Sequence, residues 1–173
     1  MNAPHFDLPG VDGKRHSPAS ARGPNGLVVM FICNHCPYVK RALEQILRDS
    51  RELAGQGIGA IAVMSNDPSD YPEDSFDNMK RVAKEKAFPF PYVIDESQDV
   101  ARAYDAVCTP DFLGFDAELR LRYHGRLQEL AEAMTGKPPA KPVNSIGCSI
   151  KWKKQPASYI VAPSVQGANS SSP

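Results

Sequence analysis

The chain of 173 residues lacks the features that mark membrane, secreted and nucleic-acid-binding proteins. No apolar run approaches the ~20 residues that a transmembrane helix needs. The first ten residues, MNAPHFDLPG, have neither the basic start nor the apolar centre of a signal peptide. The formal net charge is +0, from 20 basic and 20 acidic residues, so nothing attracts nucleic acid or an anionic membrane surface. We therefore expect a cytoplasmic protein with no nucleic-acid partner and no membrane partner.

Cysteine is scarce as well, and the four that are present are unevenly spaced: Cys33, Cys36, Cys108 and Cys148. In a reducing cytosol a CxxC pair is more often catalytic or metal-binding than a structural crosslink. A zinc site needs a second pair of ligands, but Cys108 and Cys148 are isolated and the histidines are scattered. We therefore predict no metal, and no organic cofactor either, because the cysteines themselves can carry electrons.

What is present is a regular alternation of strand and helix patterns. The apolar and β-branched stretches predict strands over 27–32, over 58–65 and near 92, and helical spacing predicts helices over 39–55, 76–87 and 126–136. A hairpin is expected over 112–125. Strands that alternate with helices run parallel, whereas a hairpin is antiparallel. The pattern predicts one α/β domain over residues 1–162, with a mixed central sheet covered by helices on both faces. An extended N-terminal arm precedes it, and residues 163–173 have the composition of a flexible tail.

The CxxC pair lies at a junction between a strand and a helix. Cys33 follows the buried strand directly, and Pro37 is a favourable residue for the first helical turn. Free N–H groups and the helix dipole should then lower the pKa of Cys33. Cys36 is expected one turn further in and more buried. An exposed attacking thiol beside a shielded resolving thiol is the arrangement for thiol–disulfide exchange.

His35 lies in the spacer between the two cysteines. An imidazole there can donate a hydrogen bond to the Cys33 thiolate. Because this would stabilise the reduced form, we predict a more oxidising disulfide than one with an apolar spacer.

Four segments resemble the thioredoxin superfamily: APHFDLPGVDGK, FICNHCPYVKR, AYDAVCTPDFLGFD and SIGCSIKWK. Over about residues 3–154 the chain is most similar to bacterial thioredoxin-like proteins that lie between alkyl-hydroperoxide-reductase peroxiredoxins and cytochrome-maturation thioredoxins. The resemblance implies a thioredoxin fold, with Cys33 as nucleophile and Cys36 as resolving cysteine. It also implies a cis bond at Thr109–Pro110 facing the CxxC, beside which a substrate peptide pairs. We accordingly assign Pro110 to the catalytic set, and Thr109 and Asn34 to substrate binding.

Some positions depart from these relatives. Ile32 stands where typical thioredoxins have tryptophan, and Leu27 where they bury an acid. The peroxiredoxin pattern Pro-x-x-x-Thr-x-x-Cys is also incomplete, because Val29 replaces the proline and Cys33 the threonine when Cys36 is aligned with the peroxidatic cysteine. A Cys–Pro pair like that of peroxiredoxins remains at Cys36 and Pro37.

Cys108 and Cys148 form a possible second redox pair that relays electrons to the first. The alternative is two buried free cysteines, which are common in proteins.

The sequence thus favours a thiol–disulfide oxidoreductase that acts on protein or small-molecule disulfides, with a thiol reductant as partner. Two alternatives stay open. One is a thiol peroxidase of the antioxidant type, and the other is a non-catalytic thioredoxin-fold module that binds a metal or a partner.

Overall fold

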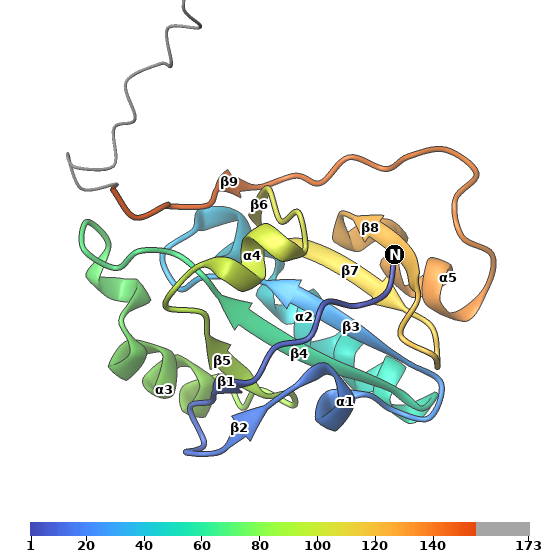
Figure 1. The fold of residues 1–173 in the computed structure, drawn as a ribbon, viewed down its shortest axis with the longest axis horizontal. Helices are drawn as coiled ribbons and strands as arrows, with labels where there is room; N and C mark the ends of the chain where they lie inside the picture. Colours follow the sequence, from blue (N-terminus) through green and yellow to red (C-terminus); the bar gives the residue numbers. More distant parts are fainter. Residues whose placement is uncertain (155–173) are drawn as a thin grey trace, which may run out of the picture.

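A five-stranded sheet in the order β5-β4-β3-β7-β8 forms the centre of the computed structural model, which describes residues 1–154 (Figure 1). Its strands are β3 (Gly26–Phe31), β4 (Ile58–Met64), β5 (Tyr92–Ile94), β7 (Asp111–Phe115) and β8 (Leu121–Gly125). The first three run parallel, and β7 and β8 are each antiparallel to their neighbours. The predicted mixed sheet is confirmed.

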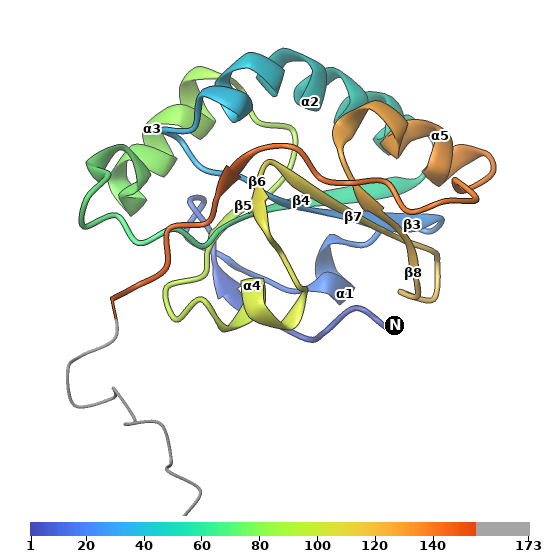
Figure 2. The same cartoon turned by 90° about the horizontal axis from the view of Figure 1, so that it is seen from above.

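Helices cover both faces of this sheet (Figure 2). On one face lie α2 (Pro37–Gly55), α3 (Phe76–Glu85) and α5 (Leu130–Thr135). On the other lie α1 (Pro18–Ala21), α4 (Asp99–Ala103) and the N-terminal arm with the short strands β1 (Leu8–Pro9) and β2 (Arg15–His16). Two 3₁₀ turns, η1 (Pro72–Asp74) and η2 (Leu127–Glu129), precede α3 and α5.

The continuous apolar pattern of β3 follows from its position in the middle of the sheet. Val28, Met30 and Ile32 pack into the core under α2, α3 and α5. The alternate side chains, Leu27, Val29 and Phe31, pack into the core on the opposite face. Because successive side chains of a strand point to opposite faces, a strand buried on both sides has no polar positions. This core fixes the end of β3, where the CxxC begins.

A second, much smaller ribbon lies at the carboxyl end of β3. It pairs β6 (Cys108–Thr109) with β9 (Cys148–Ser149) in antiparallel register. Between α5 and β9, residues 137–147 contain no helix or strand, and they carry the chain back across the molecule to β6 (Figures 1 and 2). The sequence did not predict this ribbon, because two residues of backbone pairing leave no periodic pattern.

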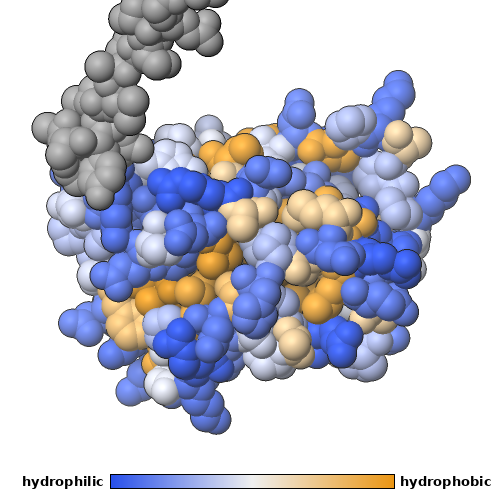
Figure 3. Space-filling model, in the orientation of Figure 1, coloured by the Kyte–Doolittle hydropathy of each residue, from blue (hydrophilic) through white to orange (hydrophobic). Residues whose placement is uncertain are grey.

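The surface of the described residues mixes apolar and hydrophilic side chains. On the face seen in Figure 3, apolar side chains are interrupted by hydrophilic ones. Among residues 1–154, no helix combines the length and apolar character of a membrane span. The predicted tail, 163–173, lies outside the described residues, as does the end of the predicted domain.

Candidate redox site

The helix after β3 begins at Pro37 as expected, but the two cysteines are placed differently relative to it. Cys36 is the N-cap residue, with an extended backbone (φ −67°, ψ 124°), and Pro37 is the first helical residue. A residue before proline is pushed out of the helical region by the proline ring, so Cys36 cannot join the helix. The expectation that Cys33 holds the helix terminus, with Cys36 one turn inside, was therefore wrong. Cys36 itself occupies the terminus.

Both thiols are buried, which corrects the expectation of an exposed Cys33. Their exposed fractions are 2% for Cys33 and 0% for Cys36. The covering group is the Thr109–Pro110 segment, whose peptide bond is cis as the resemblance implied. Thr109 Oγ1 lies 3.4 Å from Cys33 Sγ, and the Thr109 carbonyl lies 3.3 Å from Cys36 Sγ. The cis-proline segment thus touches both sulfur atoms.

The two thiols share a proton unequally. A hydrogen bond from the Cys33 thiol is the main cause that lowers the pKa of Cys36, and the Val39 N–H at the helix start also lowers it. For Cys33, donation to Cys36, burial and the nearby Asp74 charge all raise the pKa. The Thr109 carbonyl works against ionisation of Cys36, because it accepts a hydrogen bond only from the thiol form. Ionisation of either sulfur is therefore coupled to the proton on the other.

Asp74, which the sequence did not single out, organises the CNHC loop. Its carboxylate is fully buried and accepts the backbone N–H groups of Asn34 at 2.7 Å and His35 at 3.1 Å. It also accepts Asn66 Nδ2 at 3.2 Å and the His35 ring Nδ1. A buried acid is therefore present beside the pair although Leu27 replaces the one in typical thioredoxins. It comes from η1, in a loop with several acidic residues, and no pattern tells which of them is buried.

His35 is held differently from the expectation. Its Nδ1 bonds Asp74, and its ring stacks on Tyr71 with centroids 4.1 Å apart. The expected hydrogen bond to the Cys33 thiolate is replaced by this pairing, because Asp74 is the stronger, charged acceptor. His35 therefore acts on the cysteines through Asp74 and the loop.

Asn34, predicted to bind substrate, is also part of this framework. Its side-chain oxygen accepts the Tyr92 hydroxyl at 2.9 Å, and its Nδ2 donates to the Glu73 carbonyl at 2.9 Å. Both polar atoms of this buried side chain are engaged within the protein. These hydrogen bonds make Asn34 a positioning residue of the loop, and because it also lines the pocket beside Cys33, its contact with substrate stays a prediction.

The proposed pair of Cys108 and Cys148 is not brought together. Cys148 lies opposite Thr109 in the β6–β9 register, whereas Cys108 lies opposite Ser149. Since directly opposite residues share a face and successive residues alternate, Cys148 and Cys108 project to opposite faces of the ribbon. Cys148 instead packs against the core cluster that holds Cys33 and Cys36. Burial raises the pKa of Cys108 to about 12, which keeps it a thiol.

Three donors at the site have the composition of a metal-ligand set. One atom each from Cys33, His35 and Asp74 lie within 4.8 Å of one another. Open zinc sites use three protein ligands of these types. In this site, however, the imidazole and the carboxylate are bonded to each other, and Asp74 also accepts two backbone N–H groups. These hydrogen bonds account for the grouping, so a metal would have to displace the framework of the loop.

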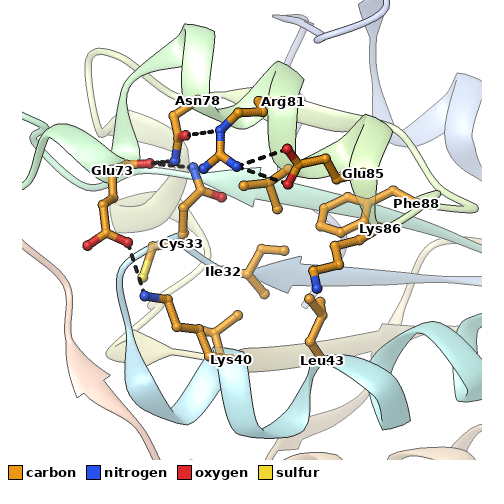
Figure 4. A pocket seen from close by; sticks show the side chains of 13 residues that line it. Ile32, Cys33, Lys40, Leu43, Glu73, Asn78, Arg81, Glu85, Lys86 and Phe88 are labelled. Carbon is orange, nitrogen blue, oxygen red and sulfur yellow. Dashed lines mark hydrogen bonds and ion pairs between the residues drawn. The ribbon is translucent and has the colours of Figure 1, made fainter.

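A pocket of about 370 Å³ between α2 and α3 ends at the CxxC (Figure 4). Cys33 lies at one end of its lining, and Phe88 and Lys86 at the other. Ion pairs flank it on two sides, from Lys40 to Glu73 at 3.0 Å and from Arg81 to Glu85 at 2.9 Å. The pocket offers a charged rim and an apolar floor beside Cys33.

The fold and this site define the class of the molecule. Helices on both faces of a mixed sheet, with a CxxC before α2 and a facing cis-proline, form a thioredoxin fold. Structures under 25% identical share it, including a thiol-disulfide oxidoreductase from Bacteroides fragilis (18% identity, TM-score 0.61, covering 79% of this chain and 96% of that one).

The family follows from the sequence. The model of the AhpC/TSA family matches residues 1–163, and the chain belongs to that family. An uncharacterized conserved protein from Geobacillus kaustophilus is 42% identical with a TM-score of 0.84, covering 90% of this chain and 93% of that one. A hypothetical protein from Sinorhizobium meliloti is 33% identical with a TM-score of 0.83, covering 90% and 94%. No curated protein matches the sequence. Family and fold together support a thioredoxin-fold redox function.

Proposed function

We propose that the protein is a thiol–disulfide oxidoreductase in which Cys33 and Cys36 cycle between dithiol and disulfide. The observation that carries this proposal is the position of the two cysteines at the start of α2, where the cis-proline segment contacts both sulfur atoms. The ionisation of the two thiols is coupled, so one sulfur can attack a disulfide while the other completes the exchange.

The substrates we propose are disulfides, which a thiolate of the Cys33–Cys36 pair attacks. The pocket beside Cys33 favours small-molecule disulfides, since the backbone edge of β6 next to Pro110 is already paired with β9. Protein disulfides require that β9 first leave this edge. A thiol reductant partner and a cytoplasmic location stay predictions.

The proposal is tested by identifying which cysteines form a disulfide in the oxidised protein and by measuring the reduction potential of that disulfide. Equilibration with glutathione redox buffers and peptide mapping should find a Cys33–Cys36 disulfide, with a midpoint within about −270 to −120 mV, the range of thioredoxin-fold dithiols. Cys33→Ser and Cys36→Ser should each abolish it, whereas Cys108→Ser should not. An oxidised wild-type protein without this linkage would overturn the proposal.

A thiol peroxidase is the second candidate, favoured by the AhpC/TSA family and by the Cys36–Pro37 pair with its lowered thiol pKa. Val29 and Cys33 stand at the positions that activate peroxide in that family's pattern. Stopped-flow reaction of the reduced protein with hydrogen peroxide separates the two functions. A rate near that of a free thiol supports the oxidoreductase, and a much faster one supports the peroxidase.

A further inference from the structure

The β6–β9 ribbon brings the C-terminal segment onto the active-site surface. Thr109 pairs with Cys148, and the backbone approaches so closely that a Cβ on Gly147 would lie 2.2 Å from the Thr109 carbonyl oxygen. Past the ribbon, Lys151 is held by Asn66 Oδ1 at 2.9 Å and by the Asp67 N–H at 2.7 Å. Cys148 is therefore held in place by contacts within the ribbon and by contacts just after it in the chain.

The register of the β6–β9 pair also places the Cys148 side chain on the face of the ribbon that contacts the CxxC. Opposite residues in an antiparallel pair have Cβ atoms about 4.5–5.5 Å apart on one face. Thr109, the residue opposite Cys148, contacts Cys33 with its hydroxyl and Cys36 with its carbonyl. Consistent with this, Cys148 packs against the core cluster that contains Cys36 and helps to lower the pKa of Cys36, while burial and the neighbouring Cys36 raise the pKa of Cys148. Cys36 thus has a thiol neighbour on two sides.

We propose that Cys148 is a third redox-active residue, which exchanges with the Cys33–Cys36 disulfide to form a Cys36–Cys148 disulfide. The inference rests on the proposed function, because it uses the disulfide which that function forms. The Cys148 thiolate attacks Cys36 Sγ, the Cys36–Cys148 bond forms, and the Cys33–Cys36 bond breaks. The bonding pair leaves on Cys33, which takes up the proton that Cys148 lost. No external oxidant is needed, because the exchange conserves the number of disulfides.

The two disulfide isomers would present different surfaces. With Cys33 bonded to Cys36, β9 is held to β6 only by backbone pairing and can separate from it. With Cys36 bonded to Cys148, β9 is fixed on Thr109, and Cys33 becomes a free thiol at the end of the pocket. The exchange would therefore close the β6 edge to peptides while the pocket stays available to small thiol compounds.

The experiment traps the exchange at Cys36. Reduced Cys33→Ser is treated with oxidised glutathione, quenched with acid, alkylated and mapped by mass spectrometry. Glutathione should first attach to Cys36, and Cys148 should then displace it, leaving a Cys36–Cys148 disulfide. Because the register holds Cys148 at a high effective concentration, we expect at least about tenfold more Cys36–Cys148 than Cys36–Cys108 linkage. In the control Cys33→Ser/Cys148→Ser, glutathione should stay on Cys36.

Glutathione that stays on Cys36 in Cys33→Ser, or a comparable yield of Cys36–Cys108, would overturn the inference. The wild-type protein, mapped at its midpoint potential, gives a second measurement that needs no substitution, and it should contain both isomers. If it contains only Cys33–Cys36, the inference fails while the proposed function stands. If Cys33–Cys36 itself is missing, the proposed function fails.

Discussion

The two sides of the redox site are built in different ways. The CNHC loop is held by the fully buried carboxylate of Asp74, which accepts two backbone N–H groups and two side chains. The facing side, at Thr109, is completed by a strand of two residues in which Cys148 is half-buried and Ser149 exposed. Asn66 is the one residue described that hydrogen-bonds both to Asp74 and to the segment after β9.

This difference separates a fixed half of the site from a removable one. Charged hydrogen bonds in a dry interior are expensive to break, so the CNHC loop should open only when the domain unfolds. A ribbon paired over only two residues, with an exposed residue in β9, opens locally at a much lower free energy. Access to the buried sulfurs should therefore be controlled from the β9 side.

The largest effect is expected from Asp74→Ala. It leaves the N–H groups of Asn34 and His35 without an acceptor, and each such loss costs about 1–3 kcal/mol. The free energy of unfolding, measured in urea, should fall by about 3 kcal/mol. The nearby exposed Asp70 provides the control, and Asp70→Ala should change it by less than about 0.5 kcal/mol. Equal losses would mean that Asp74 does not hold the loop.

Gly147→Ala should increase the access of reagents to the buried cysteines more than it lowers the stability of the protein. The added methyl would lie 2.2 Å from the Thr109 carbonyl oxygen, so β9 must move away from β6. A cost of about 1–2 kcal/mol increases the open population about 5–30-fold, and alkylation of Cys36 by iodoacetamide should accelerate equally. A Cβ on Gly55 meets no atom within 4 Å, so Gly55→Ala is the matched control. If both variants react at the wild-type rate, β9 does not control access.

The smallest expected effect is a pH dependence of the free energy of unfolding, from an ion pair next to Pro110. Asp111, next to Pro110, accepts His124 Nε2 at 2.9 Å and the Ser145 hydroxyl, and its hydrogen bond is the main cause that raises the pKa of His124. Because the pKa of His124 is higher in the folded state, its protonation stabilises the fold. This stabilisation is fully present below the unfolded-state pKa of about 6.5, and it is lost as the pH rises through the folded-state pKa.

Urea unfolding between about pH 5.5 and 8.5 should therefore show wild-type stability falling relative to His124→Gln with rising pH. Because His124 is partly exposed, the difference should stay below about 1 kcal/mol. Parallel pH profiles of the two proteins would exclude this coupling.

The sequence predicts the parts of this molecule that depend on repeating patterns. The apolar run of β3 and the helical spacing after Pro37 give the strand, the helix and the site between them. The cis bond at Thr109–Pro110 came from family resemblance, not from spacing. Asp74 and the Thr109–Cys148 pairing could not be predicted, because each depends on a single contact between segments far apart in the chain.

The β9 strand also gives the site an order of assembly during synthesis. Cys148 is made more than a hundred residues after Cys36, which at about 5–20 residues per second is a delay of several seconds or more. Throughout that interval the CxxC and the Thr109–Pro110 segment that covers it exist without β9. The redox site is therefore complete only when β9 leaves the ribosome.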